Sequence, residues 1–153
     1  MAARTLTYTA NYGTVRQPHS GITAVAWDFN SGATKFGTLS DMLLLGKIPN
    51  KSIVLEKELR MGANGAAATH LQLQLLAVEA NGAFSLLANL ITSLTGSATA
   101  AVYTDYIPYK ISLSDDRAVQ YAVLALNCST GLSETTSFSM QGIVNYLSDG
   151  RDL

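Results

Sequence analysis

Hydrophobic and polar residues alternate along most of this chain. Near the N-terminus four alternate positions are apolar or aromatic, and the positions between them are Thr or Asn; the apolar set is Leu6, Tyr8, Ala10 and Tyr12. The same spacing recurs at Val25, Trp27 and Phe29. Because successive side chains of a β-strand point to opposite faces, this period of two predicts half-buried strands.

Further stretches continue the alternation at residues 53–61, 69–78 and 135–148. In the first of these we place Ile53, Leu55, Leu59 and Met61 toward the core and Ser52, Glu56, Glu58 and Arg60 toward solvent. The Glu and Lys content of this stretch also fits a helix, but the β-branched pair Ile53-Val54 favours a strand.

Residues 118–127 (AVQYAVLALN) are apolar at almost every position. A strand covered on both faces needs no alternation, so we expect this one near the middle of a sheet. Turns rich in Gly, Asn and Asp separate about eight or nine predicted strands. The sequence therefore predicts an all-β fold, a two-sheet antiparallel sandwich of the jelly-roll type, in a single domain spanning residues 1–153.

The stretch at residues 83–95 permits two interpretations. Asn81-Gly82 is a strong signal for a two-residue hairpin turn, which would pair Leu73 with Leu90 in adjacent strands. Helical spacing is also present at Phe84, Leu87, Leu90, Ile91 and Leu94, with Asn81 placed to cap the start and Gly96 the end. We favour a short helical segment near residues 83–95.

Charged residues make up only 14% of the chain, against roughly 25% in an ordinary soluble domain. The net charge of −1 gives no attraction to nucleic acid or anionic lipid, so neither nucleic acid nor a membrane is an expected partner. The N-terminus MAARTLTYTA has no basic segment followed by an apolar core, so we expect no secretory signal. A weakly charged surface is easily desolvated, which favours packing into an assembly.

No arrangement typical of catalysis or cofactor binding stands out. Cys128 is the single cysteine, and His19 and His70 have no neighbours at zinc-ligand spacing. Asp115-Asp116 together with Asp105 would offer oxygen ligands to calcium, but paired aspartates are more typical of a turn. We therefore expect no enzymatic activity, no metal site and no cofactor.

Residues 1–14 have two open interpretations: an ordinary strand of the sandwich, or an N-terminal arm that pairs with a neighbouring chain. An unpaired strand would expose an aromatic stripe, and we expect a protein interface to involve Leu6, Tyr8, Tyr12 and Trp27. The competing use of the aromatic residues is a sugar platform, as in a receptor- or glycan-binding module of a head or tail fibre.

Two stretches resemble a known family: residues 41–61 (DMLLLGKIPNKSIVLEKELRM) and 106–127 (YIPYKISLSDDRAVQYAVLALN), the second followed by SFSMQGIVNYL. They are similar to small jelly-roll cement, or decoration, proteins of tailed bacteriophages. The resemblance implies a protein on the outer surface of the capsid, synthesised in the host cytoplasm, that reinforces contacts between major capsid subunits. Its expected partners are the major capsid protein and further copies of itself, as a homotrimer or homodimer.

Overall fold

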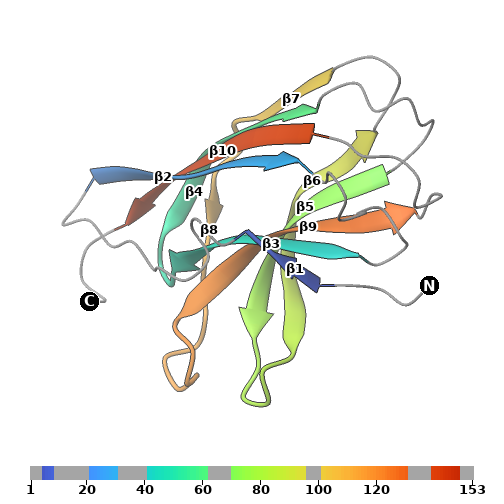
Figure 1. The fold of residues 1–153 in the computed structure, drawn as a ribbon. Helices are drawn as coiled ribbons and strands as arrows, with labels where there is room; N and C mark the ends of the chain where they lie inside the picture. The colour runs from blue at the N-terminus through green and yellow to red at the C-terminus, as the bar shows by residue number, and fades with distance from the viewer. Residues whose placement is uncertain are drawn as a thin grey trace.

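The computed structural model describes residues 5–8, 21–30, 41–61, 70–95, 101–130 and 139–148, and it places them in two β-sheets that pack face to face (Figure 1). The strands are β1 (Thr5–Thr7), β2 (Gly21–Asn30), β3 (Met42–Pro49), β4 (Ile53–Met61), β5 (His70–Val78), β6 (Phe84–Thr95), β7 (Ala101–Asp105), β8 (Tyr109–Lys110), β9 (Tyr121–Thr130) and β10 (Ser139–Ser148). No helix occurs in these residues, so none of them forms a helix long and apolar enough to cross a membrane.

The strand pairs of the two sheets are nested along the chain. Sheet A has the order β1-β3-β9-β5-β6, and sheet B has the order β2-β10-β4-β7, with β8 also paired to β4. The antiparallel pairs β2·β10, β3·β9, β4·β7 and β5·β6 enclose one another along the chain, which is the wrapping of an eight-stranded jelly roll. The predicted all-β sandwich is thus confirmed, with one exception to its antiparallel pairing: β1 lies parallel to β3.

Strand β9 occupies the middle of sheet A, between β3 and β5. One face of β9 contributes Ala122, Leu124, Leu126 and Cys128 to the core between the sheets. The opposite face contributes Val123 and Ala125 to a second cluster with Leu44 and Leu76. All six of these β9 side chains are fully buried, so the prediction of a central strand covered on both faces is confirmed.

The predicted short helix near residues 83–95 is wrong, because these residues form strand β6. The hairpin is closed by a turn in which the N–H of Gly82 donates to the carbonyl oxygen of Glu79, and Gly82 has a φ of 85° that favours glycine. Leu73 pairs with Ile91, not with Leu90 as a two-residue turn at Asn81-Gly82 would require. The pairing of β5 with β6 shifts register three times, and each shift adds one residue to β6. The β6 residues that pair with the core-facing side of β5 therefore recur every three residues; they are Ser85, Ala88, Ile91 and Leu94. This bulged strand imitates the spacing of a helix.

A β-bulge also changes the pattern of β4. Val144 pairs with Lys57 and Tyr146 pairs with Val54, so two residues of β4 stand opposite Asn145 of β10. Before the bulge the buried side chains are Ser52 and Val54, and Ile53 and Leu55 are only half-buried, contrary to the prediction. After the bulge Leu59 and Met61 are buried as predicted, and Lys57 shares their face of the strand.

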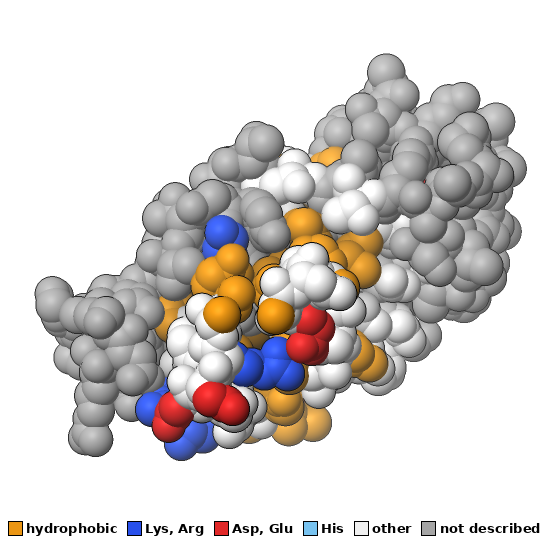
Figure 2. Space-filling view, turned by 90° about the horizontal axis from the view of Figure 1, so that it is seen from below, with side chains coloured by type: hydrophobic (Ala, Val, Ile, Leu, Met, Phe, Trp, Pro, Cys, Tyr) orange, Lys and Arg blue, Asp and Glu red, His pale blue; other side chains and the backbone are white. Residues whose placement is uncertain are grey.

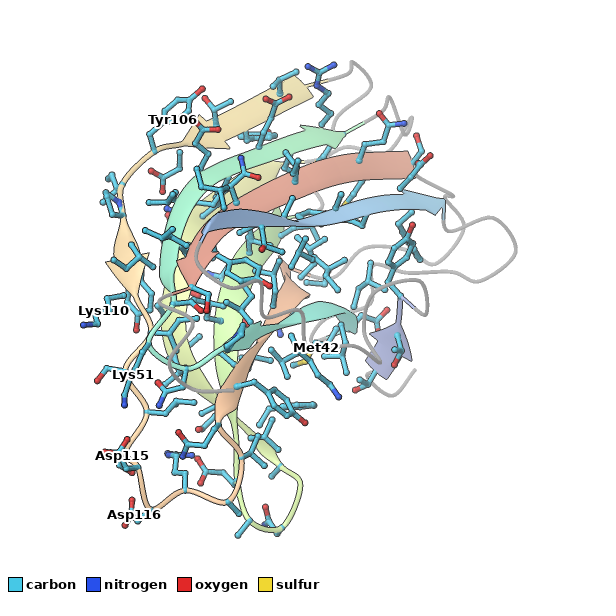
Figure 3. The ribbon with its side chains drawn as sticks, turned by 90° about the vertical axis from the view of Figure 1, so that its left-hand side faces the viewer. Met42, Lys51, Tyr106, Lys110, Asp115 and Asp116 are labelled. Carbon is cyan, nitrogen blue, oxygen red and sulfur yellow. The ribbon has the colours of Figure 1, made fainter. Side chains whose placement is uncertain are left out.

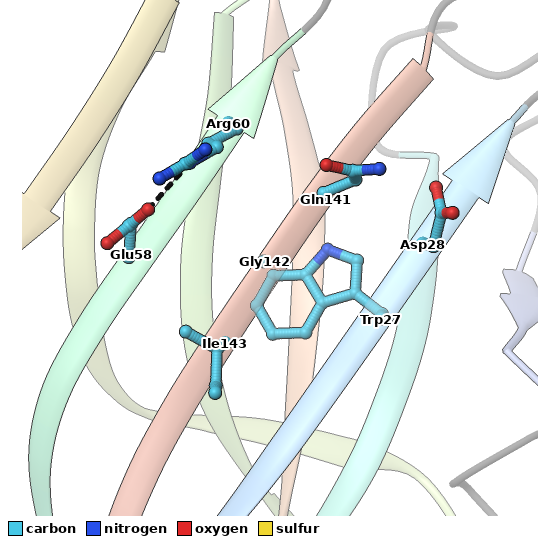
Figure 4. Close-up of a pocket in the computed structure, with 7 residues that line it drawn as sticks. All are labelled: Trp27, Asp28, Glu58, Arg60, Gln141, Gly142 and Ile143. Atoms are coloured by element: carbon cyan, nitrogen blue, oxygen red, sulfur yellow. Dashed lines mark hydrogen bonds and ion pairs between the residues drawn. The ribbon is translucent and has the colours of Figure 1, made fainter.

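Trp27 of β2 and Gly142 of β10 are paired residues. The indole of Trp27 is 3% exposed and belongs to the core between the sheets. A Cβ atom at Gly142 would lie 2.1 Å from Cζ2 of Trp27, so the ring occupies the space that a side chain would take (Figure 4). A residue without a side chain is therefore required at position 142.

The buried Asn50 side chain organises the end of the sandwich near residues 111–120. Its Nδ2 donates to the carbonyl oxygen of Leu113 (3.0 Å) and to Oε1 of Gln120 (2.8 Å). Its Oδ1 accepts hydrogen bonds from the backbone N–H groups of Lys51 (2.9 Å) and Leu113 (2.8 Å). Four bonds from one amide fix the turn after β3 against the segment that leads into β9.

We predict that Gly142→Ala lowers the free energy of unfolding by about 1–3 kcal/mol, because the new methyl group must displace the Trp27 ring. Urea denaturation followed by tryptophan fluorescence measures this effect. The control is Gln141→Ala on the exposed face of the same strand, for which we expect a change within about 0.5 kcal/mol. Equal stability of the two variants would contradict the packing described for Trp27.

Candidate functional site

The most exposed apolar segment that the structure describes is Tyr106-Ile107-Pro108, between β7 and β8, and we call it the ridge. Tyr106 is 65% exposed and Ile107 is 73% exposed. Tyr106 lies at the far end of the molecule from Asp115 and Asp116 (Figure 3). Three consecutive exposed apolar residues are unusual on a soluble protein and mark a candidate contact surface.

The backbone of the ridge is held by two charged side chains. Oδ1 of Asp105 accepts a hydrogen bond from the N–H of Ile107 at 2.8 Å. Nζ of Lys57 donates to the carbonyl oxygen of Ile107 and lies 3.7 Å from Oδ2 of Asp105. With both backbone groups of Ile107 bonded, the exposed side chain projects from a fixed position, which reduces the entropy that binding would cost.

Lys57 is an unusual residue for this position, because its side chain is only 1% exposed. Its side chain lies on the same inward face of β4 as Leu59 and Met61, where the bond to Ile107 and the nearby Asp105 carboxylate compensate the buried charge. Burial lowers the pKa of Lys57 below its ordinary value of 10.5, and the charge of Asp105 and its hydrogen bond oppose part of that shift.

A cavity of about 400 Å³ opens beside the ridge, between β6 of sheet A and the β7–β8 segment of sheet B. Its lining is mostly uncharged; the residues are Lys57, Asn89, Leu90, Ile91, Thr92, Asp105, Ile107, Pro108 and Tyr109. Leu90 belongs to the core, and Ile91 and Tyr109 pack against it. The ridge and the cavity are therefore adjacent parts of one edge of the sandwich.

The outer face of sheet B carries a second exposed apolar surface, which we call the B face. Its exposed large side chains are Ile22, Val102, Ile143 and Leu147. Leu147 pairs with Ile22 on one side and with Ile53 on the other, so three apolar residues form a row across the sheet. Lys110 is exposed and pairs with Ile53, so it lies at the end of this row. Farther along the same face Arg60 donates to Glu58 at 2.7 Å, beside a shallow hollow of about 230 Å³ (Figure 4).

The outer face of sheet A is apolar at its centre and polar beside it. The second cluster lies here, with Met42, Val78, Phe84 and Tyr121 packed around its four buried members. Nε2 of Gln74 donates to Gln72 (3.1 Å) and to Asn89 (2.9 Å), and Nζ of Lys47 lies 4.8 Å from the centre of the Tyr121 ring. Seen from below, hydrophobic side chains gather next to a group of charged ones (Figure 2).

Comparison with solved structures identifies chains of virus capsids as similar in fold. The chain matches one in the capsid of Ralstonia phage GP4 with a TM-score of 0.64 and 14% identity, over 94% of this chain and 97% of that one. A chain of the infectious bursal disease virus VP2 subviral particle gives a TM-score of 0.55 and 11% identity, over 89% of this chain and 34% of that one. This chain thus spans about a third of the VP2 chain.

At these low identities the comparisons establish the fold and nothing finer. A chain in the structure of infectious bursal disease virus Gx strain gives a similar result, with a TM-score of 0.54 and 11% identity over 90% of this chain and 34% of that one. No family model matches the sequence, and no curated protein matches it.

Of the four residues predicted for an interface, the structure describes Leu6, Tyr8 and Trp27. Leu6 of β1 pairs with Leu43 of β3. Tyr8 is half-buried, and its hydroxyl oxygen accepts a hydrogen bond from the N–H of Asp28 at 3.2 Å. Trp27 lies in the core, with 3% of its surface exposed. Tyr12 lies outside the described residues, as do residues 1–4 and 9–14 of the proposed arm.

Two of the aspartates considered as calcium ligands, Asp105 and Asp115, lie apart. Asp105 pairs with Lys57, whereas Asp115 lies 3.6 Å from Lys51 at the other end of the molecule (Figure 3). The described residues contain no group of three His, Cys, Asp or Glu side chains that could hold a metal ion, and His19 lies outside them. Lys57 was not predicted from the sequence to be buried, although its spacing from Leu59 and Met61 places it on their face of the strand.

We predict that Lys57→Met changes how stability depends on pH. Because burial lowers the pKa of folded Lys57, the unfolded chain binds its proton more tightly, and this group makes stability rise with pH from the lowered pKa up to about 10.5. The Met variant lacks that rise. The difference in unfolding free energy between variant and wild type should therefore favour Met most at neutral pH and shrink at high pH.

Denaturant unfolding of both proteins at a series of pH values measures this difference. Contributions that are common to both proteins cancel in the comparison. A difference that stays constant with pH would show that Lys57 is not desolvated in the folded protein.

Proposed function

We propose that this chain is a structural protein of a tailed-bacteriophage virion, which binds the outside of the capsid and reinforces contacts between major capsid subunits. The observation that carries this proposal is the match of its fold, almost end to end on both sides, to a chain in a phage capsid structure. The resemblance of residues 41–61 and 106–127 to phage cement proteins gives independent support from the sequence.

The surface chemistry fits attachment to other proteins. Only 14% of the residues are charged, and the B face presents a row of three apolar residues with one lysine, Lys110, at its end. Desolvating such a face costs little, because few unpaired charges must leave water. We assign the B face as the surface that contacts the capsid shell, whose matching patch we expect to be apolar and weakly charged.

The mechanism is mechanical and requires no catalytic residue. A protein that lies across the joint between two shell subunits adds buried area, and that area must be exposed again before the subunits separate. A standard interface of about 1,600 Å² is sufficient for stable attachment. Several copies that act together resist separation more strongly than their single contacts would.

Binding of the purified chain to expanded, empty capsid shells of its own phage, prepared without this protein, tests the proposal. We expect saturable binding at a fixed high copy number and a higher temperature of shell disruption, both measured by sedimentation and by heating with and without the chain. Absence of binding to the shell, with binding to fibre proteins or to cell-surface glycans instead, would overturn it and favour the receptor-binding alternative.

We predict that Val102→Asp weakens binding to the shell about tenfold, because it places a charge on the B face where Val102 is 61% exposed. The matched control is Ser112→Asp, which adds the same charge at an exposed residue outside the strands. Equal affinities of the two variants would show that the B face does not contact the shell.

A further inference from the structure

At the edge between β6 and β7 an exposed apolar ridge lies beside a cavity whose lining is mostly uncharged. We propose that two copies of this chain associate through this edge, with Ile107 of each copy entering the cavity of the other. A surface that carries both a projection and a matching recess can contact its own copy about a twofold axis, so that one contact is made twice and the assembly closes as a dimer.

The cavity is suited to an uncharged occupant. Its two charged residues, Lys57 and Asp105, are 3.7 Å apart, and both also bond the backbone of Ile107. Asn89 accepts a hydrogen bond from Gln74. A charged ligand would have to replace these partners, whereas an aliphatic side chain needs only the apolar walls that Leu90, Ile91 and Tyr109 provide.

The chain itself carries such an occupant. In the ridge, Tyr106-Ile107-Pro108, three consecutive apolar residues are exposed, and none of them carries a charge. Like charges brought together at a twofold axis would oppose association, and two ridges that meet there bring none together. The hydrogen bonds from Lys57 and Asp105 hold the ridge in place before binding.

Pairing of β6 edges is the competing way for two copies to meet at this side. β6 lies at the edge of sheet A and has no charged residue or proline over Phe84–Thr95, which would favour addition of a strand. Its three register shifts interrupt the regular series of backbone groups that a second strand would need. The contact is therefore made by side chains of the ridge and the cavity.

Three variants of the full chain separate the parts of this contact. Ile107→Asp removes the apolar projection, and Thr92→Trp fills the cavity from an exposed position of its lining without altering the ridge. Val102→Asp is the matched control, since it adds a charge to an exposed apolar residue on β7, outside the cavity lining. Circular dichroism and thermal melting confirm that each variant is folded.

Size-exclusion chromatography with light scattering, across the micromolar range, measures the mass of each protein. We expect the mass of a dimer for the wild type and the Val102→Asp control, and at least a tenfold weaker dimer for both Ile107→Asp and Thr92→Trp. A monomeric or trimeric wild type would overturn the inference. So would a dimer that survives both ridge and cavity variants or is lost in the control.

This measurement uses no capsid, so it stands apart from the proposed function. A dimer of the expected behaviour that fails to bind shells would overturn the proposed function and leave the dimer contact intact. A monomer that still coats shells would overturn the dimer contact and leave the proposed function intact.

Discussion

The fold depends on β9 being covered by protein on both of its faces. The core between the sheets covers one face, and the second cluster on the outside of sheet A covers the other. Because β9 pairs with β3 and β5, its position also determines where these two strands lie. The nested pairs then follow along the chain, and the edge strands are β1 and β6 in sheet A and β2 and β7 in sheet B.

Regular strands could be predicted from the sequence, whereas bulged strands could not. Alternation at Val25 and Trp27, and the unbroken apolar run of β9, predict their places correctly. Bulges break the period of two. The three bulges of β6 give its residues the spacing of a helix, and the single bulge of β4 exchanges the inward and outward residues that precede it. A bulge leaves no signal in a single sequence, because it depends on the partner strand.

The candidate site was harder to predict than the fold, because residue type and position disagree there. Lys57 alternates with Leu59 and Met61 and so lies on the inward face of β4, yet a lysine is normally expected in solvent, and only its contacts with Ile107 and Asp105 explain its burial. Trp27 is an aromatic residue of a predicted strand, and nothing in the sequence distinguishes an interface from a core until Gly142 is placed opposite it. The low charge of the sequence is reflected in the apolar row of the B face.

The bulges of β6 have a consequence for the solubility of the protein. A long edge strand without charges is normally a template on which further strands can stack, and a chain with so few charges has little repulsion to prevent this. A bent edge ends such stacking after one molecule, because the next strand cannot keep its register. The three bulges of β6 therefore oppose edge-to-edge stacking of copies although the strand carries no charge.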